Sequence, residues 1–203
     1  YTDNCSTRVR DAINTTLNGA IKKQLDSKSA APGVTYRWHT RRLLADDWSV
    51  DLALDYVCGP FVDHQLSQWQ ECFLPVQMMR HLRDVRIDGR PLVMNETVLH
   101  TSKTIAERSA PPSRFWPYFL IGLAIGLIIA LAGRMKNAWP RRSALALAML
   151  WCLHGTLASS LLLFGWFFTR HIPPKWDQNV LQLSPVALLL LFLIPLSFNP
   201  RFA

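Results

Sequence analysis

The fold of this chain is decided first at residues 3–12, Asp-Asn-Cys-Ser-Thr-Arg-Val-Arg-Asp-Ala, where a cysteine follows two residues that commonly cap helices. Apolar residues then recur at spacings of three and four, which predicts a helix over residues 6–17 that stops at Gly19. A side-chain oxygen of Asp3 or Asn4 can accept a hydrogen bond from the free N–H groups of the first turn. The sequence therefore predicts a capped helix that begins at a cysteine.

That cysteine, Cys5, would lie at the positive end of the helix dipole, which favours the nucleophilic thiolate form. Arg8 and Arg10 add positive charge nearby. The alternative is a small buried cysteine at a helix start, since free cysteine is often buried. The spacing alone leaves both interpretations open.

The second half of the chain contains long runs without a charged side chain. Residues 115–133 and 144–168 form two such runs, and about 20 apolar residues cross a hydrocarbon core of about 30 Å. A third run, residues 180–198, is interrupted by polar residues and Pro185. We interpret the third run as a further span in preference to a re-entrant segment, so the sequence predicts three membrane spans.

The chain divides near residue 112, into a domain outside the membrane (residues 1–112) and a membrane region (residues 113–203). Residues 1–114 carry fifteen Lys and Arg against thirteen Asp and Glu, so most of the net charge of +8 lies in the membrane region. An excess of Lys and Arg in this region is typical of the segments that flank membrane spans. We therefore do not expect nucleic acid as a partner.

The orientation follows from residues 134–142, which carry four positive charges and no negative one. The positive-inside rule places this loop in the cytoplasm. The N-terminal domain and the loop at residues 169–178 would then face outside, which in a bacterium is the periplasm. The third span would return the C-terminus to the cytoplasm, in agreement with Arg201.

The N-terminal domain has mainly helical patterns. Thr40 can cap a helix that extends to Val57 and ends at Gly59-Pro60. Ser67-Gln-Trp-Gln70 has the form of a capping box.

Pro75 suits the first turn of a further helix that reaches Leu82. Asp88-Gly89, between two short apolar segments, is a signal for a two-residue β-hairpin.

Three separated motifs then resemble a known family. They are the stretch at residues 3–12, PGVTYRWHTRR at residues 32–42 and LSQWQECFLP at residues 66–75. In this order they are similar to the Lnb-type periplasmic domain, whose best-studied members are bacterial lipoprotein N-acyltransferases. The resemblance implies an α+β fold, the C-terminal part of a permuted papain-like cysteine domain, mainly helical in this chain and followed by a multi-span membrane region.

The resemblance also implies roles for individual residues. Cys5 would be the nucleophile, and the general-base histidine would precede it along the chain, so we expect residue 1 to be a truncation point. Within this sequence His39 is the local candidate for a base or a substrate contact, and its arginine neighbours favour its neutral form. The substrate-binding candidates are polar residues close to these two: Asn4, Arg8, Arg37 and Arg41.

The remaining histidines and cysteines give weaker signals. His64, His81 and His100 are expected to be solvated, and His154, in the second membrane span, to form hydrogen bonds between helices. Cys58 and Cys72 are either joined by a disulfide outside the cytoplasm or small buried residues.

The spacing of cysteines and histidines matches no metal-site motif, and no glycine-rich phosphate loop is present. We therefore expect neither a metal nor a cofactor.

The sequence favours a membrane-anchored cysteine acyltransferase of the bacterial inner membrane. It would transfer an acyl chain through a thioester, with membrane lipid as a partner and a bacterial lipoprotein or a phospholipid as the substrate. The alternatives are a papain-like peptidase or amidase of the cell envelope, and a non-catalytic membrane scaffold.

Overall fold

The computed structural model describes residues 2–100, 107–170 and 175–197. The protein is mostly helical (63%) with a small two-stranded sheet, which confirms the mainly helical expectation. It divides into an N-terminal unit, residues 1–51 and 62–111, and a membrane unit, residues 52–61 and 112–203. The main boundary coincides with the Pro111-Pro112 junction, whereas the grouping of residues 52–61 with the membrane unit has no signal in the sequence.

The first predicted helix is present as α1 (Cys5–Thr16). Its N-cap is Asn4, whose side-chain oxygen accepts a hydrogen bond from the Thr7 backbone N–H at 2.9 Å. The Thr7 hydroxyl oxygen in turn accepts from the Asn4 N–H at 2.8 Å, which completes a capping box. This reciprocal pair fixes the position at which α1 begins.

Helix α1 ends at its C-cap, Leu17, before the predicted stop at Gly19, and Gly19 is the N-cap of another helix, α2 (Ala20–Leu25), which the sequence reasoning missed. The φ angle of Gly19 is 82°, a left-handed conformation that glycine adopts at little cost. The chain therefore turns sharply between α1 and α2. Ile21 and Leu25 of α2 are fully buried.

The next helix begins earlier than predicted. The N-cap of α3 (Tyr36–Leu43) is Thr35, whose hydroxyl oxygen accepts a hydrogen bond from the Trp38 backbone N–H at 3.0 Å. Thr40 lies inside α3, and its hydroxyl donates to the Tyr36 carbonyl instead of capping. A second helix, α4 (Trp48–Val57), follows α3, and a short 3-10 turn, η1 (Pro60–Asp63), comes after Gly59.

Both further helix starts of the N-terminal unit are confirmed. The capping box of Ser67 and Gln70 begins α5 (Gln68–Glu71), and Pro75 occupies the first turn of α6 (Pro75–Leu82). In each case the interaction that starts the helix involves residues within one turn, so the sequence is sufficient to locate it.

The predicted hairpin is also present. Strands β1 (Arg86–Ile87) and β2 (Arg90–Pro91) pair in antiparallel orientation. The φ angles of Asp88 and Gly89 are 50° and 79°, both left-handed as the favoured two-residue hairpin turn requires.

One hydrophobic cluster of the N-terminal unit lies between α2, α5 and the hairpin. Its buried members come from these elements and their flanks: Ile21, Leu25, Trp69, Cys72 and Val85. Arg10 of α1 covers the Trp69 ring of this cluster, since its guanidinium lies 3.8 Å from the centre of that ring. The same group donates a hydrogen bond to the Trp69 carbonyl at 2.9 Å, so α1 is joined to α5 by one buried arginine.

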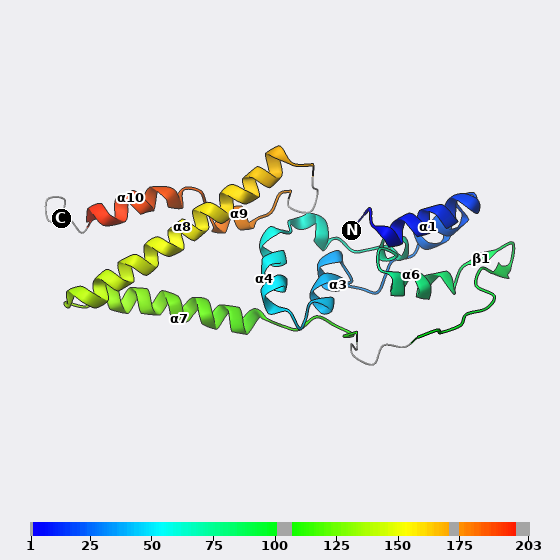
Figure 1. Cartoon of the computed structure of the whole chain (residues 1–203), viewed down its shortest axis with the longest axis horizontal. Coiled ribbons are helices and arrows are strands. Elements are labelled where there is room, and N and C mark those ends of the chain that lie inside the picture. The colour runs from blue at the N-terminus through cyan, green and yellow to red at the C-terminus, as the bar shows by residue number, and fades with distance from the viewer. Residues whose placement is uncertain (1, 101–106, 171–174, 198–203) are drawn as a thin grey trace. The chain divides into compact units, whose positions relative to one another are not determined.

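The membrane unit contains α7 (Phe115–Gly133), α8 (Ala138–Phe168), α9 (Asn179–Gln182) and α10 (Ala187–Ser197). Three segments are long and apolar enough to cross a membrane, residues 115–133, 138–168 and 179–196. Helices α7 and α10 both contact α8, and Figure 1 shows α7 and α8 diverging from the turn that joins them.

The helices differ from the predicted spans in two places. The second helix begins at Ala138, six residues before the predicted start, and includes Arg141 and Arg142 in its first turns. The third is interrupted between α9 and α10. Residue 198, its predicted end, and Arg201 lie outside the described residues.

Residues 52–61 pack within the membrane unit. The Asn179 side-chain amide donates hydrogen bonds to the carbonyls of Asp55 and Tyr56, at 2.9 and 3.2 Å. A Cβ at Gly59 would lie 2.3 Å from the Lys175 carbonyl oxygen. The segment after α4 and the segment before α9 therefore approach each other so closely that only glycine fits at position 59.

Candidate functional site

Cys5 is the first residue of α1 and is exposed. The residues on either side of it attach the start of α1 to the connection between α5 and α6. The Asn4 amide donates a hydrogen bond to the Phe73 carbonyl at 3.0 Å, and the Ser6 hydroxyl donates to the Cys72 carbonyl at 2.9 Å. The thiol is therefore accessible on a backbone that is fixed on both sides.

The first turn of α1 also presents backbone donors. The first N–H groups of a helix have no acceptor within the helix, and here the Asn4 side chain takes the Thr7 N–H. Within residues 2–100, 107–170 and 175–197, the N–H groups of Cys5 and Ser6 have no hydrogen-bond acceptor. Such donors beside a nucleophile can stabilise the oxyanion of an acyl-transfer intermediate.

The arginines expected to act near Cys5 are both engaged. Arg8 forms an exposed ion pair with Asp3, with a 2.7 Å bond from Nη2 to Oδ2. This hydrogen bond from Arg8 lowers the pKa of the Asp3 carboxyl. Arg10 is buried against Trp69. Only Arg8, which is on the surface, is accessible to a substrate.

His39 is fully buried in α3. Its Nε2 lies 2.8 Å from Glu71 Oε1, and Arg42 Nε donates to its Nδ1 at 3.1 Å. A guanidinium only donates, so Nδ1 accepts and Nε2 carries the hydrogen that is donated to Glu71. With both ring nitrogens engaged and the ring inaccessible, this arrangement favours a structural role for His39 over that of a base.

Glu71 binds a second histidine through its other oxygen, since His81 Nε2 lies 2.7 Å from Oε2. Burial by itself would raise the pKa of Glu71, but the hydrogen bonds to His39 and His81 outweigh it and lower that pKa to about 2. The expectation that His81 is solvated is wrong, because its side chain is 14% exposed and paired. We call His39, Glu71 and His81 the histidine–glutamate cluster; it joins α3, α5 and α6.

Sequence reasoning missed this cluster because its members are far apart in the chain. Glu71 is separated from His39 by 32 positions and from His81 by ten. The one local signal was a carboxylate directly before the apolar residues Cys72, Phe73 and Leu74.

The other predicted substrate-binding residues have partners within the protein. Arg37 donates to both oxygens of Asp63, at 2.7 and 3.1 Å, and Arg41 Nε lies 3.4 Å from the buried Asp51 carboxylate. Asn4 uses its oxygen as the helix cap and its nitrogen to bind Phe73. The structure thus brings Asn4 and Cys5 together at the start of α1, and it places Arg37, Arg41 and His39 on α3.

The remaining cysteines, Cys58, Cys72 and Cys152, form no disulfide. Cys58 and Cys72 are both buried and belong to different units, which corresponds to the second of the two alternatives left open by the sequence. Burial raises the pKa of the Cys72 thiol to about 12, so it does not ionise at neutral pH.

His154, in the membrane unit, contacts the ring of Tyr56, with centroids 6.1 Å apart. Among the described residues, no group of three or more His, Cys, Asp or Glu could hold a metal ion.

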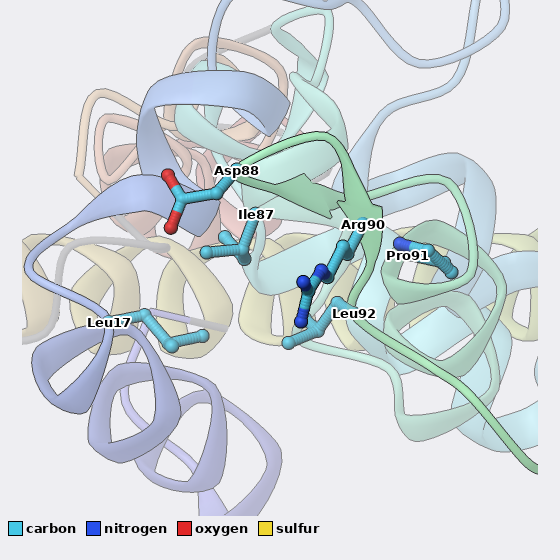
Figure 2. A pocket seen from close by; sticks show the side chains of 6 residues that line it. All are labelled: Leu17, Ile87, Asp88, Arg90, Pro91 and Leu92. Carbon is cyan, nitrogen blue, oxygen red and sulfur yellow. The ribbon is translucent and has the colours of Figure 1, made fainter.

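The described residues of the N-terminal unit line a larger and a smaller hollow. Figure 2 shows the larger of these, about 490 Å³, which Asp88 and Arg90 of the hairpin line together with apolar side chains that include Leu17. Leu17 is the C-cap of α1, about 18 Å along the helix from Cys5 at 1.5 Å per residue, so this hollow is not a pocket for the thiol.

The smaller hollow, about 290 Å³, includes Thr2, Arg10 and Lys22 in its lining. Thr2 precedes Cys5 by three residues and Arg10 belongs to the same helix. This hollow therefore places two cationic side chains, Arg10 and Lys22, beside the residues that precede Cys5.

Comparisons with protein-family models, curated proteins and solved structures found no match.

Proposed function

We propose that this protein is a membrane-anchored cysteine acyltransferase that passes an acyl chain through a thioester on Cys5 to a bacterial lipoprotein. The observation that carries the proposal is an exposed cysteine at the first residue of a capped helix, in a chain with three candidate membrane spans. The resemblance of residues 3–12, 32–42 and 66–75 to the Lnb-type domain supports it and supplies the proposed permuted papain-like fold.

The reaction would have two steps. A base removes the proton of the Cys5 thiol, and the thiolate attacks the ester carbonyl of a phospholipid, so that a C–S bond forms, the C–O bond to glycerol breaks and the leaving alkoxide takes the proton from the base. The amine of the lipoprotein then attacks the thioester, an amide forms, the C–S bond breaks, and the proton lost by the amine passes through the base to the departing thiolate. The N–H groups of Cys5 and Ser6 would stabilise the oxyanion in both steps.

The membrane unit favours this activity over a peptidase or amidase. Spanning helices anchor the protein in the membrane, where the ester bonds of lipids are found, whereas a peptidase does not need a membrane anchor. With the cationic segment at residues 134–142 inside, the N-terminal unit would lie in the periplasm and the spans in the inner membrane. We do not assign the base to His39, because both of its ring nitrogens are engaged.

The test is thioester formation in membranes that contain the full chain and a phospholipid with an alkyne-tagged acyl chain. We expect a label on the protein that hydroxylamine releases and that maps to Cys5. Cys5→Ala and Cys5→Ser should both lose it, since a serine hydroxyl is far less ionised at neutral pH.

The matched controls are Cys72→Ser and Cys152→Ser, which remove a buried thiol and a thiol of α8 and should keep the label. An unlabelled wild-type protein, or a label that persists in a well-expressed Cys5→Ala variant, would contradict the assignment of the nucleophile.

A further inference from the structure

We propose that a groove in the membrane unit binds the acyl chain of a membrane phospholipid. The groove has a volume of about 310 Å³, at the lower end of the range of about 300–1,000 Å³ that is typical of small-molecule sites. One wall is the end of α4 and the other is a face of α8. Tyr56 and Val57 line the first wall, and Ala158, Leu161, Gly165 and Thr169 line the second.

The lining is suited to hydrocarbon. The residues from α8 follow one another at spacings of three and four, so they lie on one face of the helix. Leu161 is 71% exposed there, on a segment apolar enough to cross a membrane. The Thr169 hydroxyl donates to the Gly165 carbonyl at 2.7 Å and so is satisfied within the chain. A flexible alkyl chain fits such a surface better than a polar ligand does.

Contacts within the same unit hold the two walls in place. The Asn179 amide binds the carbonyls of Asp55 and Tyr56, which attaches the end of α4 to α9. Val180 and Leu183 pack in turn against Leu162 of α8. The groove is therefore a built feature of the unit and not a chance gap beside a single helix.

The position of the groove along α8 indicates how a lipid would enter. Thr169 is the residue after the last turn of α8, and Arg170, which follows it, is exposed. Close by in the chain, the rings of Trp166 and Trp176 lie 5.5 Å apart, and tryptophan is enriched at the membrane interface. An anionic headgroup would meet Arg170 at this end, with its acyl chain extending along α8 toward Ala158.

This inference deepens the proposed function by naming a site for the acyl chain of the donor. It rests on that function only for the later transfer of the acyl chain to Cys5, because binding of the acyl chain in the groove does not require Cys5.

The test uses the full chain in vesicles of phosphatidylethanolamine and phosphatidylglycerol that contain a phospholipid with a diazirine in its acyl chain. After illumination, mass spectrometry locates the cross-links. We expect them to concentrate in residues 52–57 and 156–165, and to be lost in Ala158→Phe, which fills the groove from α8, and in Val57→Trp, which fills it from α4.

The matched control is Leu157→Phe, because Leu157 is 58% exposed on α8 but does not line the groove; it should keep the pattern. Cross-links spread evenly over α7, α8 and α10, or unchanged in both groove variants, would overturn the proposal. Localised cross-links that persist in Cys5→Ala would support the groove independently of the thiol. If Cys5→Ala also kept the thioester label, the assignment of Cys5 as the nucleophile would be wrong, but the proposed groove would still be supported.

Discussion

At the scale of single residues, burial separates groups of the same chemistry into different roles. Cys5 and Cys72 are both free, but Cys5 is exposed on the first turn of α1 whereas Cys72 is fully buried and has a pKa raised to about 12. The Ser6 hydroxyl binds the Cys72 carbonyl, so the inert cysteine lies in the segment to which the start of α1 is attached.

The Glu71 carboxylate should make the stability of the N-terminal unit depend on acid. Its pKa is about 2 in the folded protein against an ordinary value of 4.5, so the folded state favours the ionised form. The stabilisation is present above pH 4.5 and is lost as pH falls toward 2. Its full size is up to about 3 kcal/mol, at about 1.4 kcal/mol for each pKa unit.

The variant Glu71→Gln should remove this acid dependence, and at pH 7 it should cost about 1–3 kcal/mol because His39 and His81 lose a charged partner. Amide hydrogen exchange of α3, α5 and α6 in the full chain measures both effects. Asp84→Asn, at an exposed carboxylate, is the control. Unchanged protection at pH 7, or an acid loss equal to that of the wild type, would show that the histidine–glutamate cluster does not stabilise the unit.

At the scale of elements, hydrogen bonds between residues three positions apart fix the start of several helices, and Asn4 is the most informative case. It caps α1 through its oxygen and binds the Phe73 carbonyl through its nitrogen. Asn4→Ala should lose both interactions, about 1 kcal/mol for the cap and about 1 kcal/mol for the second bond. Asn4→Ser keeps a capping oxygen and should lose only the second contribution.

Hydrogen exchange of the peptide that covers α1 distinguishes the two variants, because opening of α1 alone exposes those amides. An equal loss of protection in Asn4→Ala and Asn4→Ser would mean that the cap contributes nothing and that the bond to Phe73 anchors the helix by itself.

At the scale of the whole molecule, the orientation in the membrane can be tested directly. Arg134 and Lys136 lie in the connection between α7 and α8, while Arg141 and Arg142 occupy the first turns of α8. All four remain at one end of two candidate spans, so the positive-inside rule still applies. Reporter fusions at Lys136 should report the cytoplasm, and fusions at Trp48 and Lys175 should report the outside.

A cytoplasmic signal from the Trp48 fusion would contradict the orientation, and with it the assignment of the thiol to the periplasm. A control with Arg134 and Lys136 both replaced by glutamine should weaken the bias, since two of the four charges would be gone.

The sequence by itself determined the features that depend on neighbouring residues. The N-cap at the start of α1, the capping box at Ser67, the hairpin at Asp88-Gly89 and the start of α6 at Pro75 all depend on residues within one turn; the choice of Asn4 over Asp3 as the cap came from the structure. The spans follow from the thickness of a bilayer. Where these local rules failed, at Thr40 and Gly19, another turn competed: Thr35 capped α3, and the left-handed Gly19 allowed α2 to follow.

Only the tertiary structure decided which distant side chains meet. The histidine–glutamate cluster joins residues from three helices, and the groove joins the end of α4 to α8 across about a hundred positions of sequence. Burial decided that Cys72 is inert and that His39 has no free ring nitrogen. Such outcomes depend on the path of the backbone and on the cost of removing charge from water, and neither is encoded in the pattern of any single segment.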